Sequence, residues 1–203
     1  MSVAVKICGV CTIEDARAAV AAGADLLGLN FVRESPRSIN VERGRAIARV
    51  VPGTPLVGVF VNAPREAVAR IAADVGLAGL QFHGDESPDD CRGWSQWTMK
   101  GLRARPGDDL AARAARYDTT YLLLDAFVPG VAGGTGVALD PAAAAGLERA
   151  RLFVAGGLRP DTVADVVRRL RPHGVDVASG VERSPGVKDH GQIQEFIRRA
   201  KAA

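Results

Sequence analysis

A single carboxylate, Asp125, ends an apolar run, Tyr121 to Leu124, near the middle of the chain. An unpaired carboxylate in apolar surroundings costs several kcal/mol, so its position indicates a chemical role, that of an acid. The loop that follows contains Gly133-Gly134-Thr135-Gly136. Glycines allow backbone N–H groups to approach an anion closely. The stretch therefore predicts an acid beside part of a phosphate site.

Other reactive side chains and glycine turns also follow apolar runs. They are a thiol (Cys8), a guanidinium (Arg37), an imidazole (His83) and the turns Gly156-Gly157 and Ser179-Gly180. Each has a simpler explanation by itself, because cysteine is often a buried, inert residue and histidine can equally belong to the core. Their common position at the ends of apolar runs favours a shared site.

The elements that must position these residues alternate between short apolar runs and helical stripes with apolar residues at i, i+3, i+4 and i+7. Ser87-Pro88 and Asp140-Pro141 are typical helix starts, and a short extra helix is expected at Val181-Glu182-Arg183. The runs predict eight strands: Val3–Cys8, Leu26–Phe31, Leu56–Val61, Gly79–Phe82, Thr98–Leu102, Tyr121–Asp125, Leu152–Ala155 and Val175–Ala178.

Eight such units without a linker predict an α/β protein, a compact (βα)8 TIM barrel in which residues 1–203 form a single domain. The 203 residues give about 25 per unit, so the loops must be short. The alternative is an open doubly wound sheet, but the first turn, Cys8-Gly9-Val10-Cys11, lacks the G-x-G-x-x-G fingerprint of dinucleotide folds. In a TIM barrel the ends of the strands meet at one rim, where active sites lie.

Composition restricts the other classes of function. The chain has 47% apolar and 24% charged residues and a net charge of +3, which is too mild to argue for nucleic acid binding. No run approaches the length of a membrane span, and no signal peptide is evident, so a cytoplasmic location is expected. Three cysteines, an odd number, do not make a disulfide framework. Cys8 and Cys11 form a C-x-x-C, but no second Cys/His pair supports a metal or redox site.

Strand alternation makes a further prediction about Lys6 and Asp176. Lys6 shares a strand face with Cys8, and Asp176 shares one with Gly180. Only a closed barrel makes the first and last strands neighbours. We therefore expect a Lys6–Asp176 salt bridge beneath the site, with the ammonium helping to keep Cys8 ionisable.

With these residues placed, the chain resembles the phosphoribosylanthranilate isomerase family of tryptophan biosynthesis over nearly its whole length. The resemblance is specific because several motifs occur in family order. They are Val5-Lys6-Ile7-Cys8-Gly9, Ser35-Pro36-Arg37, Gln81-Phe82-His83-Gly84, Leu124-Asp125, Gly133-Gly134-Thr135-Gly136, Ala155-Gly156-Gly157-Leu158 and Asp176-Val177-Ala178-Ser179-Gly180-Val181-Glu182.

The resemblance implies an Amadori rearrangement of N-(5-phosphoribosyl)anthranilate to 1-(2-carboxyphenylamino)-1-deoxyribulose 5-phosphate, with no metal and no organic cofactor. Cys8 would be the general base, Asp125 the general acid, and Arg37 and His83 substrate-binding residues, with Arg37 on the anthranilate carboxylate. The phosphate would be bound by Gly134, Thr135, Gly136, Gly156, Gly157, Ser179 and Gly180.

The chemistry sets expectations for the pKa values of the acid and the base. Asp125 must hold its proton near neutral pH, so its pKa should lie above the usual ~3.9. Cys8 must be available as a thiolate, so its pKa should lie at or below the usual ~8.5. Two departures from the family pattern, Val137-Ala138-Leu139 and Asn30, affect the loop after Asp125 and the grip on the aromatic ring. The alternatives are a bifunctional or histidine-pathway phosphosugar isomerase and a non-catalytic phosphosugar-binding barrel. The protein is expected to be a monomer or a homodimer.

Overall fold

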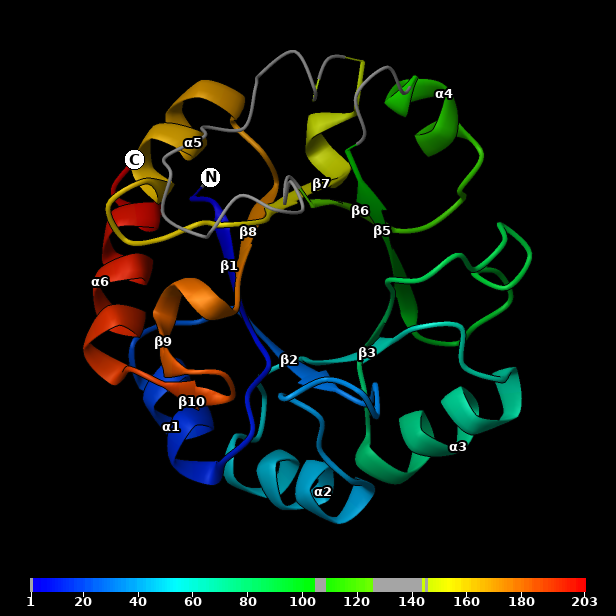
Figure 1. Cartoon of the computed structure of the whole chain (residues 1–203), viewed down its shortest axis with the longest axis horizontal. Coiled ribbons are helices and arrows are strands. Elements are labelled where there is room, and N and C mark those ends of the chain that lie inside the picture. The colour runs from blue at the N-terminus through cyan, green and yellow to red at the C-terminus, as the bar shows by residue number, and fades with distance from the viewer. Residues whose placement is uncertain (1, 105–108, 126–143, 145) are drawn as a thin grey trace.

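The computed structural model describes residues 2–104, 109–125, 144 and 146–203 and contains a closed barrel of parallel strands (Figure 1). Each strand pairs with its neighbours in sequence, and β1 pairs with β8 to close the barrel. This confirms the predicted TIM barrel and rules out the open sheet. The strands are β1 (Ala4–Cys8), β2 (Leu26–Asn30), β3 (Leu56–Phe60), β4 (Gly79–Phe82), β5 (Trp97–Arg103), β6 (Tyr121–Asp125), β7 (Leu152–Ala155) and β8 (Gly174–Val177).

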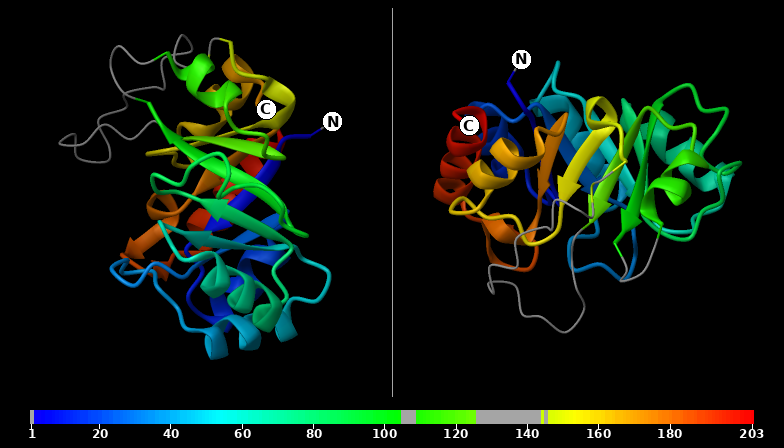
Figure 2. Two further views of the ribbon diagram at one scale, coloured as in Figure 1. Left: turned by 90° about the vertical axis from the view of Figure 1, so that its right-hand side faces the viewer. Right: turned by 90° about the horizontal axis from the view of Figure 1, so that it is seen from above.

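The described helices lie outside the barrel, as Figures 1 and 2 show, and cover its apolar outer surface. Side chains that point outward from the strands, such as Val5 and Ile7, are buried in this layer. The start of β1 and the end of α6 lie near one another in all views. The helices are α1 (Ile13–Ala21), α2 (Val41–Val50), α3 (Arg65–Val75), α4 (Leu110–Ala115), α5 (Val163–Leu170) and α6 (His190–Lys201).

A second apolar cluster fills the barrel interior at the end opposite the predicted site. Phe153 and Trp97 each pack edge-on against Tyr121, with ring centroids 5.3 and 5.4 Å apart. Gly79 and Gly174 make room for these rings, because a Cβ there would lie 2.3 Å from Trp97 and 2.2 Å from Phe153. The interior is therefore plugged with aromatic side chains below the rim.

The predicted helix at Ser87–Asp90 is wrong, because residues 84–96 form turns that lead directly from β4 to β5. The local signal itself is present. The Ser87 hydroxyl and backbone N–H both donate to Asp90 Oδ2, at 2.7 and 2.8 Å. The chain then reverses at Gly93, whose φ is +67°, and Trp94 packs against Phe82. Tertiary packing therefore prevents a helix from forming after this first turn.

The extra helix predicted at residues 181–183 is also wrong. A single 3₁₀ turn, η3 (Ser179–Val181), follows β8 and leads into a hairpin of β9 (Glu182–Ser184) and β10 (Val187–Lys188). The predicted helix that begins at Asp140 lies outside the described residues. Among the helices that the structure describes, none combines the length and apolarity needed to cross a membrane.

Candidate active site

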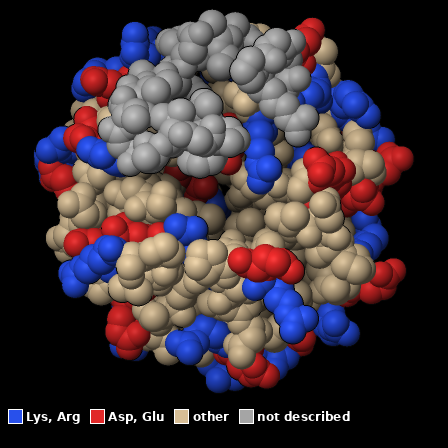
Figure 3. All heavy atoms as spheres, in the orientation of Figure 1, with Lys and Arg blue, Asp and Glu red and all other residues tan. Residues whose placement is uncertain are grey.

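A cavity of about 280 Å³ opens at the carboxyl ends of the strands. It is lined by all the predicted site residues that the structure describes, namely Cys8, Arg37, His83, Asp125, Gly156, Gly157, Ser179 and Gly180. Figure 3 views this rim face on, and the surface is hollowed near its centre with charged side chains beside the hollow. Gly134, Thr135 and Gly136, and the departure at Val137-Ala138-Leu139, lie outside the described residues.

Cys8 ends β1 and faces the cavity, with Lys6 one layer below it. The Lys6 ammonium is fully buried and lies 2.8 Å from Asp176 Oδ1, which confirms the predicted salt bridge. Lys6 and Asp176 are also register partners between β1 and β8. Gly28 of β2 leaves room for this layer, since a Cβ there would meet Cys8 Sγ at 2.8 Å and Lys6 Nζ at 2.9 Å.

Burial raises the pKa of the Cys8 thiol above its ordinary value, so the expected low pKa is wrong for the ligand-free protein. The Lys6 ammonium is the main influence in the opposite direction, through its charge and a hydrogen bond, while Asp176 partly cancels it. The pKa of Lys6 is itself raised: burial lowers it, but the charges of Asp176 and Cys8 outweigh that effect. Lys6 therefore stays an ammonium and is available as a counter-ion for a thiolate.

Asp125 ends β6, across the cavity from β1, and contacts His83 at the end of β4. His83 Nε2 lies 3.3 Å from Asp125 Oδ2. On the other side of the imidazole, Nδ1 lies 3.2 Å from the Nε2 atom of Gln81. Both Asp125 and His83 are about one-fifth exposed, so a molecule in the cavity can reach them. His83 was predicted to bind substrate, and here it also bonds to the predicted acid.

Arg37 lies above the cavity and is held by Glu182 through two hydrogen bonds, Nε to Oε1 at 2.8 Å and Nη2 to Oε2 at 2.7 Å. Lys188 also donates to Glu182 Oε1, at 2.9 Å. The Arg37 side chain packs over Gly9, where a Cβ would lie 2.5 Å from Cδ of Arg37. One edge of the guanidinium is thus occupied by the protein, and the Nη1/Nη2 edge remains to pair with a second carboxylate.

The Arg37–Glu182 pair joins residues far apart in sequence, so no local motif predicts it. The loop carrying Arg37 is fixed from the end of β2, because Asn30 Nδ2 donates to Ser35 Oγ, which accepts from Arg37 N. Asn30, noted as a departure from the family pattern, thus has a structural role in placing Arg37.

Two glycine turns form the wall of the cavity after β7 and β8. Gly156 and Gly157 have φ values of +88° and +67°, which L side chains rarely adopt. A Cβ on Gly180 would lie 1.8 Å from the carbonyl oxygen of Leu158, so the two loops pack backbone to backbone. Ser179 begins η3 beside them. Exposed backbone N–H groups in such turns can bind a phosphate.

No metal or disulfide chemistry is visible among the described residues. They contain no group of three or more His, Cys, Asp or Glu side chains arranged to hold a metal ion. Cys8 and Cys11 are both free thiols. Cys11 points under the Arg37 loop, where its Sγ lies 3.5 Å from the carbonyl oxygens of Gly9 and Arg37. Cys8 faces the cavity, whereas Cys11 lies under the loop, so the two thiols of the C-x-x-C have different surroundings.

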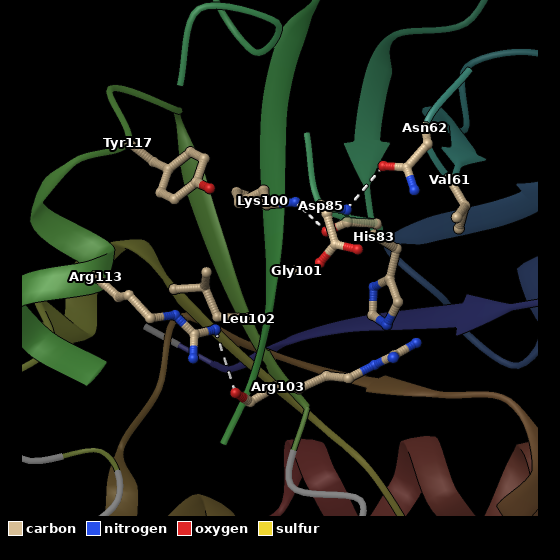
Figure 4. A pocket seen from close by; sticks show the side chains of 11 residues that line it. Val61, Asn62, His83, Asp85, Lys100, Gly101, Leu102, Arg103, Arg113 and Tyr117 are labelled. Carbon is tan, nitrogen blue, oxygen red and sulfur yellow. Dashed lines mark hydrogen bonds between the residues drawn. The ribbon is translucent and has the colours of Figure 1, made fainter. Parts of the chain in front are cut away.

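A second pocket lies beside the first and is shown in Figure 4. His83 lines both pockets. In Figure 4 the Arg103 side chain extends toward the His83 ring, and Arg113 donates to the Arg103 carbonyl oxygen at 3.3 Å. Lys100 is neutralised by Glu86, with Nζ and Oε2 separated by 2.6 Å. The imidazole thus stands between the cavity that contains Cys8 and a region with several charged groups.

A closed parallel barrel with a cavity at the carboxyl ends of its strands defines a protein of the (βα)8 class, in which active sites lie at this rim. Comparison with known proteins gives the particular family. Residues 5–199 match the sequence model of N-(5'phosphoribosyl)anthranilate (PRA) isomerase. The chain belongs to this isomerase family.

Individual relatives agree with this assignment. The N-(5'-phosphoribosyl)anthranilate isomerase of Pseudomonas paraeruginosa is 48% identical over 97% of this chain and 94% of its own. The crystal structure of phosphoribosyl anthranilate isomerase from Thermotoga maritima has a TM-score of 0.91 at 38% identity, covering 99% of this chain and 100% of that one. A crystal structure of the isomerase in complex with reduced 1-(o-carboxyphenylamino)-1-deoxyribulose 5-phosphate has a TM-score of 0.87 at 36% identity, covering 99% and 100%.

Proposed function

We propose that the chain carries out the isomerase reaction of its family with Cys8 as general base and Asp125 as general acid. The substrate is N-(5'-phosphoribosyl)anthranilate, and the product is 1-(2-carboxyphenylamino)-1-deoxyribulose 5-phosphate. The observation that carries the proposal is that a thiol on β1 and a carboxylate on β6 line one cavity together with the glycine turns after β7 and β8.

The acid step opens the furanose ring. Asp125 gives a proton to the ring oxygen, the C1–O bond breaks, and the nitrogen lone pair forms the C1=N bond of a Schiff base. Asp125 is left as a carboxylate. Proton transfer from a positioned acid contributes on the order of 10²–10⁴-fold. The bond to His83 at 3.3 Å supports this role, because an imidazole N–H stabilises the carboxylate that forms.

The base step removes a proton from C2. Cys8 takes this proton as a thiolate, and the electron pair of the C–H bond moves into an enamine, which becomes the ketose when the C2 hydroxyl loses its proton and C1 gains one. No atom or electron is gained overall. The buried Lys6 ammonium supports the role of Cys8, because it supplies the positive charge that a thiolate needs in a site removed from water.

The remaining residues bind the two anionic ends of the substrate. Gly156, Gly157, Ser179 and Gly180 offer backbone N–H groups to the phosphate, with Gly134, Thr135 and Gly136 as further predicted contacts. Arg37 uses its Nη1/Nη2 edge for the anthranilate carboxylate while Glu182 holds the other edge. The phosphate is remote from the reacting carbons, so its binding energy can contribute to catalysis.

The test is fluorescence-monitored turnover of phosphoribosylanthranilate by the purified protein. We expect conversion to the ketose that requires both Cys8 and Asp125. Binding of the substrate without turnover would instead favour the non-catalytic phosphosugar-binding barrel, and isomerisation of the histidine-pathway aminoimidazole substrate would favour a bifunctional enzyme. The single-domain organisation of residues 1–203 and the monomeric or homodimeric state remain predictions.

A further inference from the structure

Gln81 is the buried polar residue of the cavity that the proposed acid and base do not use. It lies on β4 and is 2% exposed. Its Nε2 atom is 3.2 Å from His83 Nδ1, and the opposite imidazole nitrogen, Nε2, is 3.3 Å from Asp125 Oδ2. A chain of three side chains thus leads from the barrel interior to the proposed acid.

The donor and acceptor properties of this chain select one form of the imidazole. An amide NH₂ group can only donate, so Nδ1 of His83 must accept and cannot carry a proton. The proton of the neutral imidazole then lies on Nε2, from which it is donated to Asp125 Oδ2. One proton therefore satisfies both contacts.

A glutamine turned by 180° would reverse the direction of the hydrogen bonds. Its Oε1 would accept from Nδ1–H, and Nε2, without a proton, would accept from the acidic O–H of Asp125. In the structure Oε1 is buried and has no hydrogen-bond partner among the described residues. Gln81 itself lines the cavity.

Gly101 on β5 leaves the space that the imidazole occupies. A Cβ on Gly101 would lie 2.3 Å from His83 Nδ1, so the ring can lie here only because this residue is glycine. Within that space the contacts with Gln81 and Asp125 orient the ring.

We propose that Gln81 is a positioning residue that fixes His83 as the Nε2–H tautomer, so that His83 donates to Oδ2 of Asp125 and confines the acidic proton of Asp125 to its other oxygen. This inference rests on the proposed function, in which Asp125 protonates the ring oxygen of the sugar. The proton is thereby carried on one defined atom. When it leaves, the new carboxylate keeps the hydrogen bond from Nε2–H, which strengthens as the charge forms.

The first test measures the tautomer directly in the ligand-free protein. The chain has three histidines, so ¹⁵N-histidine labelling gives few signals, and His83→Asn identifies the one that belongs to His83. We expect a protonated Nε2 and an unprotonated Nδ1 near neutral pH. A proton on Nδ1, alone or on both nitrogens, would overturn the inference. This measurement does not depend on turnover, so it stands even where the proposed isomerase function fails.

The second test changes Gln81 at nearly constant size. Gln81→Glu replaces the donor by a carboxylate that only accepts, so His83 should acquire a proton on Nδ1. Nε2 then either accepts the proton of Asp125 or keeps its own in an imidazolium, which favours the ionised Asp125 carboxylate. In both cases Asp125 has no free proton to give to the sugar. We expect kcat to fall at least about tenfold with KM changed by less than about threefold. Gln81→Met, which makes no hydrogen bond, should give a smaller fall in kcat.

Two controls separate positioning from general damage. Gln96→Glu introduces the same charge just before β5, at the other end of the barrel, and should leave kcat unchanged. His83→Gln can still donate an amide N–H to Asp125, so it should retain far more activity than His83→Leu. An unaltered His83 tautomer in Gln81→Glu, or equal loss in His83→Gln and His83→Leu, would overturn the inference. Circular dichroism identifies variants that fail to fold, and for those the tautomer of the parent protein decides.

Discussion

The ammonium group of Lys6 and the carboxylate of Asp176 lie 2.8 Å apart inside the barrel, where β1 and β8 meet. Neither side chain is more than 8% exposed. The two strands are neighbours only because the sheet closes, so the pair depends on closure. The same ammonium also lies against the Cys8 thiol and acts on its charge. One buried charge pair therefore connects the last strand pairing of the fold with the proposed base.

Removing the positive partner should destabilise the protein strongly. Lys6→Met leaves Asp176 without its counter-charge in the barrel interior, and breaking a buried pair in this way costs about 3–5 kcal/mol. Urea unfolding followed by circular dichroism measures the loss. The double variant Lys6→Met/Asp176→Leu should recover much of it, because no unpaired charge remains. A loss below about 1 kcal/mol in Lys6→Met would mean that the pair is not buried as described.

Lys6 should also set the pH dependence of the reaction. The active form of Cys8 is the thiolate, so kcat/KM should rise with pH through the pKa of Cys8 in the free enzyme. Burial raises this pKa, and Lys6 lowers it, against Asp176 and with a smaller contribution from Lys188. Lys6→Met should therefore move the rising limb of the pH profile to higher pH. A limb that stays in place, or moves to lower pH, would contradict the role of Lys6.

Cys8 and Asp125 should be separately essential, because they act on different protons. Cys8→Ser and Asp125→Asn should each reduce kcat by about 10²–10⁴-fold while binding of inorganic phosphate stays nearly unchanged. Cys11→Ser is the matched control, since this thiol lies under the Arg37 loop. Steady-state kinetics decide the matter. Activity within tenfold of the parent in either variant would remove that residue from the mechanism, and loss in Cys11→Ser would revive a role for the C-x-x-C.

The fold was largely predictable because alternation along a strand and periodicity along a helix are local signals. Lys6 and Asp176 illustrate this, since period two and closure together specified their contact. The absence of a helix at Ser87–Asp90 was not predictable in the same way. Its hydrogen bonds are present, but the turn at Gly93 and the packing of Trp94 on Phe82 decide against a helix. These are tertiary effects that a local pattern does not contain.

The placement of the candidate site residues at one rim was predictable, and the placement of their partners was not. Cys8 and Asp125 could be placed there because each ends an apolar strand. The bond between Arg37 and Glu182 joins two loops that are brought together only by the closed barrel and the β9–β10 hairpin. The raised pKa of Cys8 results from burial that no short motif expresses. The role of Gln81 depends on a distance of 3.2 Å to an imidazole nitrogen, which spacing in sequence cannot supply.

Arg37 should distinguish the aromatic carboxylate by its paired hydrogen bonds. Lysine offers a point charge without the planar fork, so Arg37→Lys loses both this geometry and the bidentate contact with Glu182. We expect KM for phosphoribosylanthranilate to rise at least about tenfold, since a hydrogen bond to a charged group contributes about 1.5–3 kcal/mol. Arg33→Lys, an exposed position in the same loop, is the matched control. Unchanged kinetics in Arg37→Lys would place its guanidinium outside the substrate site.

The phosphate site can be tested at a pair of glycines that differ only in location. Gly157 and Gly53 both have positive φ, +67° and +85°, and a Cβ on either meets no protein atom within 4 Å. Alanine at either position therefore carries a similar backbone strain of about 1 kcal/mol or somewhat more. Gly157 borders the cavity, whereas Gly53 follows α2 at the opposite end of the barrel.

Gly157→Ala should raise the inhibition constant of inorganic phosphate at least about tenfold, because its Cβ occupies space needed by the anion beside the backbone N–H groups. Gly53→Ala should leave that constant unchanged. Equal inhibition constants in the two variants would show that the phosphate is bound elsewhere, as would sulfate density in a crystal that appears only away from Gly157 and Gly180.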